Sequence, residues 1–551
     1  MKMEKKVHLQ TSSDRISNLP ESLKHRILSF LSTRDAVRTI ILSNSWRTAW
    51  AKRPSLDLSS LSIGSSLRED TLSGSNKDDD ALKAKRERFY DFLDRAFTFR
   101  LITKLDKFKL YVPCFGLELK DRLDHWLGRA VLCQVRNLDL EIGGEGPRYS
   151  VARSVLNASS ITKLRLKKCE LNLSSLRHTQ LPRLRVLDLT NVYLDEVVMG
   201  RLLASCPNLE EFTCGYCYGL TRLEISGLTK IETVCVILES KDQLKAIKIK
   251  APSLLEFSYM YRGSFDEESC NIALLGCRNL KKLELDRFRL MDCDIFFLLD
   301  RFPVLEKLIF RDCHNLEFVK ISSKHLVDLD LCGCRKLEKA EINTPNLQSF
   351  SFYVETGQDI ISLVSKGHTL KLKYAHIHLI GGAFTDQWYV RLIKLFAVLS
   401  HSDRFYIYVR SKEDIIIPEE VRMIYPPPLY GVKHLLIDVP AENTPVELLE
   451  SLLWLAPCPE SINIHHPFTW PSFCKVFKFT YEMPLKRKEN CGCWKSLHVN
   501  CWRHSLNKVL LESQKRDADN IWRENKSDNT ALAHFFCNAR IDGKTVSFVE
   551  E

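Results

Sequence analysis

The sequence lacks the segments that would place the chain in a membrane or direct its export. No uninterrupted apolar run reaches the ~18 residues that a membrane-spanning helix needs. Residues 1–13 carry positive charge but no apolar stretch follows them, so we expect no secretory signal. The nucleotide-binding, serine-hydrolase and zinc-protease motifs are missing from any usable context. We therefore expect a nuclear or cytoplasmic protein that is not an enzyme and binds no cofactor.

Charge and cysteine content favour an intracellular protein with protein partners. The net charge of +11 over 551 residues is a mild bias that does not require nucleic acid. Residues 1–60 are more basic, with 11 Lys/Arg against 5 Asp/Glu, which favours an acidic partner for this segment. The 19 cysteines are an odd number, and a disulfide framework is not expected without a secretory signal. We expect reduced cysteines that serve as small buried apolar residues.

An apolar-x-x-apolar-x-apolar motif recurs every 21–30 residues through the middle of the chain. Its copies begin at Leu105, Val135, Ile161, Leu184, Leu209, Ile231, Leu254, Leu280, Leu305, Leu326 and Leu347. The alternation predicts a short strand whose apolar side faces a core shared by neighbouring repeats. Period and pattern resemble the leucine-rich repeat. The resemblance implies an α/β solenoid, a horseshoe whose concave surface is lined by the residues between the strand leucines.

Several cysteines fit the same repeat. Four lie three residues after the last apolar position of a motif, where leucine-rich repeats carry Asn or Cys: Cys169, Cys217, Cys313 and Cys334. We interpret these four as structural and expect no metal at them. A separate cluster of three cysteines and one histidine has spacings that differ from those of common zinc sites, so we expect no metal there either. Its members are Cys491, Cys493, Cys501 and His504.

Residues 14–54 predict three short helices. Pro20 suits a first helical turn, Ser32 and Asp35 form a capping-box-like pair, and Ser43 precedes a helix with Trp46 one turn before another tryptophan. The segment holds more large apolar side chains than a 40-residue core can bury, which indicates an exposed surface for a partner. The alternative is a helical cap on the solenoid. A Ser-rich stretch after residue 54, interpreted as a flexible linker, argues against a cap, because a cap abuts what it covers.

This segment resembles an F-box of the plant F-box/leucine-rich-repeat type. The matching residues are Asp14–Glu21, Ile27–Leu31, Asp35–Thr39, Leu42–Ser43, Trp46–Arg47 and Trp50. The resemblance implies a substrate-recognition subunit of an SCF-type ubiquitin ligase. Its F-box would dock a Skp-family adaptor, and through it cullin and RING subunits, while the repeats bind a protein substrate. By motif position the resemblance places seven residues against the adaptor: Leu19, Pro20, Ile27, Leu28, Leu31, Val37 and Trp46. Asn44–Ser45 depart from the family, which often has a basic residue beside the tryptophan.

The expected domain organisation has four parts: an F-box at 14–54, a flexible Ser-rich linker at 55–80, a repeat solenoid at 81–360, and an irregular continuation with a C-terminal cap at 361–551. The last part resembles the FBD-like domain that closes such proteins. Within it, residues 387–400 predict a helix, and three segments predict strands: 405–409, 432–437 and 506–511. The return segments 313–325 and 334–346 are too short and irregular for a full helix.

The expected concave residues change sign from repeat to repeat. They run from the cations Lys163, Arg165 and Lys167 to the acids Asp328 and Asp330. A nucleic-acid surface is uniformly basic, so this mixture favours a protein partner, and we expect neither nucleic acid nor membrane as partners. Two other functions stay open: a scaffold whose F-box no longer recruits the ligase, and a small-molecule-sensing receptor.

Overall fold

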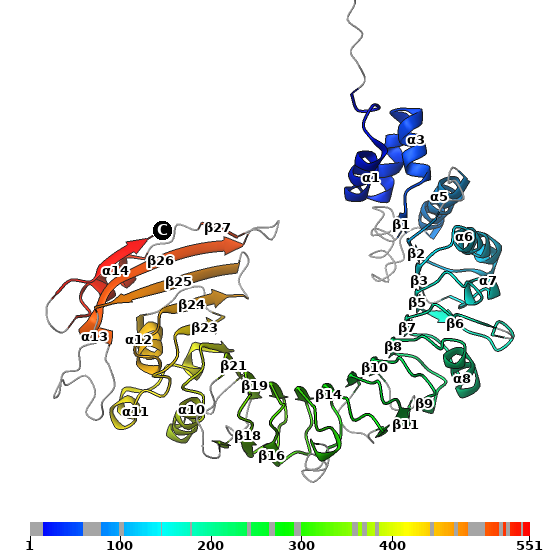
Figure 1. Cartoon of the computed structure of the whole chain (residues 1–551). Helices are drawn as coiled ribbons and strands as arrows, with labels where there is room; N and C mark the ends of the chain where they lie inside the picture. The colour runs from blue at the N-terminus through cyan, green and yellow to red at the C-terminus, as the bar shows by residue number, and fades with distance from the viewer. Residues whose placement is uncertain are drawn as a thin grey trace, which may run out of the picture. The chain divides into compact units, whose positions relative to one another are not determined.

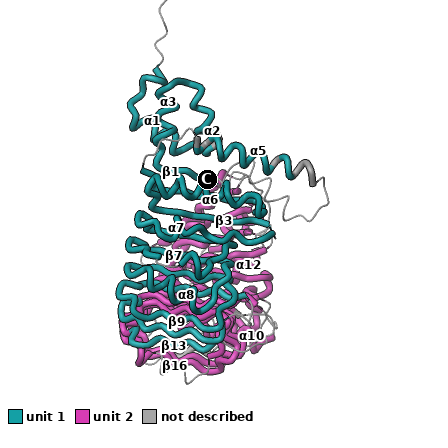
Figure 2. The backbone as a smooth tube through the Cα atoms, turned by 90° about the vertical axis from the view of Figure 1, so that its right-hand side faces the viewer, with its two compact units in different colours: residues 1–254, 270–277 teal, residues 255–269, 278–551 magenta. Residues whose placement is uncertain are grey.

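The structure is a computed structural model, in which the chain forms two compact units. One unit holds residues 1–254 and 270–277, and the other holds residues 255–269 and 278–551 (Figure 2). The residues that the structure describes are 15–58, 79–98, 104–144, 146–176, 179–239, 244–263, 270–290, 299–354, 362–365, 372–380, 385–440, 446–467, 472–482, 502–516, 522–524, 529–540 and 544–550.

The three predicted N-terminal helices are confirmed, and we call residues 15–54 the helical module. Its elements are α1 (Glu21–Phe30), α2 (Thr33–Arg38), the 3-10 turn η1 (Thr39–Ile41) and α3 (Asn44–Ala51). Two predicted caps form. The Ser32 hydroxyl oxygen accepts the backbone N–H of Asp35 at 3.1 Å, and the Ser43 hydroxyl oxygen accepts that of Trp46 at 3.4 Å. Each cap satisfies an N–H group that a helix N-terminus leaves without an internal partner.

A strand follows the helical module directly. This strand, β1 (Ser55–Leu58), pairs in parallel with β2 (Lys107–Val112), and its two leucines are buried. The Thr33 hydroxyl of α2 donates to the Asp57 carbonyl of β1, so the helical module abuts the first strand of the sheet. The prediction of a linker that starts at residue 55 is therefore wrong, because Leu56 and Leu58 enter the core.

The rest of the predicted linker, residues 59–78, lies outside the described residues. The chain resumes with α5 (Asp79–Thr98). Helical spacing predicts one apolar face with four members, of which Phe89, Leu93 and Phe97 are buried and Phe92 is half-buried. The argument that a linker separates the helical module from the repeats thus fails. What distinguishes a cap from a docking module is whether apolar side chains of the module remain exposed.

The sheet of the first unit gains one parallel strand per repeat. After β2 come β3 (Asn137–Ile142), β5 (Lys163–Lys167), β7 (Val186–Thr190), β8 (Glu211–Gly215) and β10 (Thr233–Leu238). The register is kept throughout, so one apolar row crosses six strands: Phe108, Leu138, Leu164, Leu187, Phe212 and Val234. Side chains alternate along a strand, so this row faces the core and the intervening residues lie on the opposite side, the open face.

The return segments of the first unit cover the apolar face of its sheet (Figure 1). They are η2 (Leu117–Leu119), α6 (Lys120–Leu132), β4 (Tyr149–Ser150), α7 (Arg153–Leu156), β6 (Cys169–Glu170) and α8 (Glu196–Ala204). Three later return segments form a small parallel sheet of their own: β9 (Arg222–Ser226), β11 (Ala246–Lys250) and β13 (Asn271–Leu275). No repeat closes a core alone, and stacking buries the apolar residues of each between its neighbours.

The second unit repeats this plan. Its parallel strands are β12 (Glu256–Tyr261), β14 (Lys282–Asp286), β15 (Lys307–Arg311), β17 (Asp328–Cys332), β19 (Ser349–Val354), β21 (Tyr374–Leu379), β22 (Arg404–Val409), β23 (His434–Asp438) and β24 (Ser461–His466). The return segments begin as the strands β16 (Phe318–Ser322), β18 (Lys339–Asn343) and β20 (Ser362–Ser365), then become the helices α10 (Asp386–Val398), α11 (Glu419–Ile424) and α12 (Val446–Leu455). An array with one parallel strand per repeat has the architecture of a solenoid. The horseshoe curvature stays a prediction.

The repeats after residue 360 are more regular than predicted. The helix at 387–400 and the strands at 405–409, 432–437 and 506–511 are confirmed, but β21 to β24 continue the parallel order without interruption. In these strands Phe, Ile and Val occupy core positions that carry Leu in earlier repeats. The leucine-based motif therefore does not reveal these repeats in the sequence. Segments 313–325 and 334–346 hold no helix, as expected, but each contains a strand.

The turns that end the strands explain the four repeat cysteines. The residue after the strand has a positive φ, as at Lys168 (φ 56°), Asp312 (φ 52°) and Gly333 (φ 71°), and the buried cysteine comes next. The Cys313 thiol donates to the carbonyls of Leu285 and Arg311, both at 3.5 Å. A thiol in this place therefore joins its own strand end to the preceding repeat, and the predicted burial of Cys169, Cys217, Cys313 and Cys334 is confirmed.

The C-terminal part closes the second unit with antiparallel strands. These are β25 (Ser472–Tyr481), β26 (Leu506–Arg516) and β27 (Trp522–Glu524), while β28 (Ser547–Glu550) pairs with β26 in parallel. The helices α13 (Trp502–Ser505) and α14 (Thr530–Cys537) supply aromatic rings to the closing core. The buried Arg540 guanidinium pairs with Glu482 at 2.9 Å and donates to the Leu506 carbonyl at 3.1 Å.

Candidate protein-interaction surfaces

Six large apolar side chains of the helical module are exposed to solvent. Ile41 is 87% exposed and Phe30 is 79% exposed. We call the full set the apolar helical surface: Ile16, Leu23, Ile27, Phe30, Ile41 and Leu42. Three of them are spaced by four and three residues along α1 and therefore share one face of that helix. Exposed apolar side chains gathered on so small a module mark a surface for a partner.

The core of the helical module is filled by other residues. Leu28 is 0% exposed, Trp46 2% and Trp50 1%, and small Ala49 packs beside them. The Trp46 indole N–H donates to the Ile16 carbonyl at 3.3 Å, which fixes the ring inside the module. Because two tryptophans already fill a core of about 40 residues, the remaining Leu, Ile and Phe side chains have no interior left to enter.

The structure places the seven predicted adaptor-contact residues in three environments. Pro20 and Ile27 are exposed, whereas Leu19, Leu31 and Val37 are half-buried. Leu28 and Trp46 are buried in the module, so their side chains present no exposed surface in this chain. Contact of all seven residues with an adaptor stays a prediction.

Sequence reasoning left five exposed residues out of the contact set: Ile16, Leu23, Phe30, Ile41 and Leu42. Helical periodicity places Leu23, Ile27 and Phe30 on one apolar face of α1, but the buried residues of this helix are Lys24 and Leu28. Which part of a wide apolar face is covered depends on how α1 crosses α3, and no local pattern encodes that angle.

Ser45, at the position that departs from the family pattern, has a structural role. The Lys24 ammonium is buried, and it donates to the Ser17 carbonyl at 2.7 Å and to the Ser45 hydroxyl oxygen at 2.9 Å. Ser45 in turn donates to the Ser17 carbonyl at 3.0 Å. A buried ammonium is costly without acceptors, and these two oxygens supply them. The serine therefore links α1, α3 and the segment before α1.

The helical module also carries exposed basic residues, one of which, Arg38, pairs with Asp35 at 3.2 Å. Arg26, Arg38 and Arg47 are all exposed. Lys52 forms an ion pair with Glu21 at 3.0 Å, and this neighbour lowers the pKa of the Glu21 carboxyl. Exposed apolar and basic side chains on one module suit an acidic partner, whose charge would also speed its approach.

The open face of the first unit carries charges that are paired across neighbouring strands. Lys167 of β5 pairs with Glu141 of β3 at 3.1 Å, and Arg165 of β5 pairs with Asp188 of β7 at 3.2 Å. Arg165 and Lys167 of β5 are thus each paired with an acid of a neighbouring strand. The predicted change of sign between repeats has a physical cause, because opposite charges in register attract across the sheet.

The open face of the second unit carries an aromatic band on β19, β21 and β22. We define the band as Tyr353, Tyr374, His376, His378, Tyr406 and Tyr408. Its rings follow the strand register: Tyr353 lies beside His378 at 5.9 Å between centroids, and His378 stacks on Tyr408 at 5.3 Å. The sequence analysis did not identify this band. Its signal was the alternation of aromatic and aliphatic residues in YAHIHL and RFYIYV.

The aromatic band is close to uncharged near neutral pH. Burial lowers the pKa of His376 and of His378, and the neighbouring imidazole lowers that of His378 further. The Tyr406 hydroxyl donates to Asp438 at 2.6 Å, and burial together with this carboxylate raises the tyrosine pKa. Asp438 also raises the pKa of His465 to about 10, from 3.5 Å away, with a further contribution from Cys474. The band therefore offers rings and hydroxyl groups rather than net charge.

Two other expectations concern metal and membrane. Cys491, Cys493 and Cys501 lie outside the described residues, whereas His504 is buried in α13. Among the residues that are described, no group of three His, Cys, Asp or Glu side chains is arranged to hold a metal ion. Within the same ranges, no helix has both the length and the apolar character needed to cross a bilayer.

A three-helix module joined to a parallel one-strand-per-repeat array defines a class of protein: a repeat protein with a docking module. Two family models match the chain. An F-box domain covers residues 16–58, and the leucine-rich-repeat domain described as At1g61320/AtMIF1 covers residues 102–270 and 268–401, more than half of the chain. The chain therefore belongs to the F-box/leucine-rich-repeat family.

Individual relatives come from Arabidopsis thaliana. The chain is 28% identical to the FBD-associated F-box protein At1g66310 over 48% of its own length and 51% of the relative. It is 32% identical to the F-box/LRR-repeat protein At4g14096, over 36% of this chain and 39% of the relative, and 26% identical to F-box/LRR-repeat protein 13, over 45% and 46%. The chain spans about half the length of the curated relatives it matches.

Proposed function

We propose that this chain is the substrate-recognition subunit of an SCF-type ubiquitin ligase. F-box domains in general bind Skp-type adaptors, which connect to cullin and RING subunits. In this proposal the chain performs no chemistry itself. The helical module docks on the adaptor, and the repeats hold a protein substrate where ubiquitin is transferred.

The observation that carries the proposal is the apolar helical surface. Its side chains are exposed although the core beneath them is complete, so no rearrangement is needed to present them. Burying Ile41, which is 87% exposed, contributes about 1.5–3 kcal/mol to binding, and Phe30 a similar amount. The excess of Lys and Arg over Asp and Glu in residues 1–60 supports an acidic adaptor over a neutral one.

The aromatic band supports a protein substrate on the second unit. Tyrosine is enriched among the residues that dominate binding energy at protein interfaces, because its ring buries apolar area and its hydroxyl forms a hydrogen bond. Four tyrosines and two neutral histidines on adjacent strands make a continuous surface of this kind.

Capture of a Skp-family adaptor by the purified full chain tests the ligase role. We expect the wild type to capture the adaptor, and the double variant Phe30→Ser/Ile41→Ser to lose more than 90% of it, since roughly 3 kcal/mol is about a hundredfold in Kd. A second variant, Leu19→Ala/Pro20→Ala, tests the motif residues. Leu117→Ser is the matched control, because Leu117 is 73% exposed on the same unit but outside the helical module.

Two results would contradict the proposal. Undiminished capture by Phe30→Ser/Ile41→Ser would show that the apolar helical surface is not the docking site. Absence of capture by the wild type would favour the alternative, an interaction scaffold without ligase. Equal unfolding temperatures of variant and wild type establish that a loss of capture is a loss of contact.

A further inference from the structure

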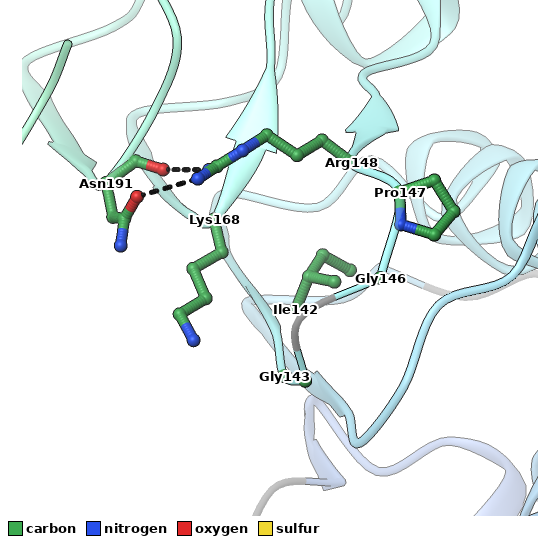
Figure 3. Close-up of a pocket in the computed structure, with 8 residues that line it drawn as sticks. Ile142, Gly143, Gly146, Pro147, Arg148, Lys168 and Asn191 are labelled. Carbon is green, nitrogen blue, oxygen red and sulfur yellow. Dashed lines mark hydrogen bonds between the residues drawn. The ribbon is translucent and has the colours of Figure 1, made fainter.

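Side chains at the ends of the strands join neighbouring repeats in two ways. In the first unit, the Arg148 guanidinium donates to the Asn191 carbonyl at 2.6 Å and to the Asn191 amide oxygen at 3.1 Å, which joins the segment after β3 to the end of β7 (Figure 3). In the second unit, at the ends of β15 and β17, cysteine thiols donate to carbonyls of the preceding repeat. A thiol differs from a guanidinium because it can form a covalent bond with a second thiol.

Cys313 and Cys334 occupy the same position in consecutive repeats. The register of β15 with β17 pairs Lys307 with Asp328, and each cysteine comes six residues after its member of that pair. Neighbouring strands lie about 4.8 Å apart, which is within the ~4.4–6.8 Å between Cα atoms that a disulfide requires. The other two of the four repeat cysteines follow β5 and β8, which are separated by β7. Only Cys313 and Cys334 among these four therefore belong to adjacent strands.

The sulfur atoms of Cys313 and Cys334 lie against the same strand end. The Cys313 thiol donates to the Arg311 carbonyl at 3.5 Å, and the Cys334 thiol donates to the Phe310 carbonyl at 3.7 Å, one residue earlier on β15. Contact with the Cys313 thiol, together with burial, raises the pKa of the Cys334 thiol. The strand register and the carbonyl contacts thus bring the two thiols together.

A third cysteine, Cys332, lies close by but on the other side of β17. Side chains alternate along a strand, so Cys332 is on the open face, where it is half-buried, whereas Cys334 is buried on the core side. Burial and the Asp330 carboxylate raise the pKa of the Cys332 thiol. Cys332 is therefore the competitor that an experiment must separate from Cys334.

We propose that Cys313 and Cys334 form a reversible disulfide, which joins two repeats covalently, when the chain meets hydrogen peroxide. One thiolate attacks a peroxide oxygen to give a sulfenic acid, and the released hydroxide takes up a proton to become water. The second thiol then displaces the sulfenic oxygen as a second water, so two thiols and one peroxide give one disulfide and two waters. Cys313 is 0% exposed and Cys334 3%, so the reaction starts only when this end of the repeats opens.

The disulfide would add a covalent link to two strands that ion pairs already join. On the open face, Lys307 pairs with Asp328 at 2.5 Å and Arg311 pairs with Asp330 at 2.9 Å. The disulfide closes a loop over residues 313–334, which restricts the opened state and so favours the closed one. Because β17 also pairs with β19, oxidation would make the part of the open face beside the aromatic band more rigid.

Peptide mapping of the full chain after treatment with hydrogen peroxide tests the site. Trypsin would place Cys313 in the peptide 312–320, and Cys332 and Cys334 in the peptide 325–335. We expect the oxidised wild type to yield these two peptides joined, lighter than their sum by two hydrogen atoms, and dithiothreitol to separate them. Cys332→Ser is the matched control and should yield the same joined peptides, whereas Cys334→Ala should yield none.

Hydrogen exchange of the β15 and β17 amides gives a second measure. We expect exchange to be roughly tenfold slower, or more, in the oxidised than in the reduced wild type. Three results would each overturn the proposal: no joined peptides from the oxidised wild type, their loss in Cys332→Ser, or equal exchange in the two redox states. The helical module contains no cysteine, so adaptor capture does not depend on this reaction and the two tests fail independently.

Discussion

Replacing Arg540 by methionine should loosen the C-terminal closure of the second unit. The side chain is 1% exposed, and it joins Glu482 at 2.9 Å to the carbonyls of Leu506 at 3.1 Å and His504 at 3.4 Å. Methionine fills much of the same volume but leaves both carbonyls without this donor, at about 1 kcal/mol each. Glu482 keeps Lys544 at 3.5 Å, so the broken ion pair adds about 1 kcal/mol rather than the larger cost of an isolated buried charge.

The expected total of about 3 kcal/mol corresponds to roughly a hundredfold faster opening of β26. Hydrogen exchange of the β26 amides, resolved by mass spectrometry, measures this opening without requiring that the whole chain unfold in one step. Lys544→Met is the control, because Lys544 is 58% exposed and its contact with Glu482 contributes little. The reasoning is refuted if β26 exchanges equally fast in the wild type and in Arg540→Met, or if Lys544→Met matches Arg540→Met.

Three further outcomes follow. Ile41→Ser alone should raise the Kd for the adaptor about tenfold or more in titration calorimetry, and an unchanged Kd would exclude Ile41 from the interface. Gly333→Ala should lower the unfolding temperature, because φ is +71° and its Cβ would collide with the Asp312 carboxylate; an unchanged melting curve would contradict this. Asp438 raises the His465 pKa from 6.5 to about 10, so this stabilisation is complete below pH 6.5 and is lost as pH rises towards 10. His465→Gln should therefore lose less stability between pH 6.5 and 10, and identical slopes in thermal unfolding would refute the coupling.

Much of the fold was predictable because its signals are local. The Ser32 and Ser43 caps, the helix at 387–400 and the strand of each repeat follow from short patterns that the structure confirms. Strand β1 was missed because SLDL sits beside a Ser-rich stretch whose composition indicates a linker. Its burial depends on β2, about 50 residues later, and no local window contains that partner.

The candidate site was predictable in kind but not in detail. Excess apolar content correctly indicated an exposed surface on the helical module, but it did not indicate that Leu28 and Trp46 are buried while Phe30 and Ile41 are exposed. Exposure is decided by the packing of α1 against α3, which is a tertiary property. The aromatic band has a local alternation on each strand, but its assembly depends on register between strands 25–30 residues apart, which no single window contains.

The buried turn cysteines are probes of local opening within the repeat array. Burial raises the pKa of the Cys169 thiol to about 12, so almost no reactive thiolate exists while that repeat stays closed. Other repeats carry a buried cysteine in the same turn position: Cys217, Cys277, Cys313 and Cys334. The alkylation rate of each cysteine would report how often its repeat opens. A bound substrate would lower the alkylation rates of the cysteines in the repeats that it contacts.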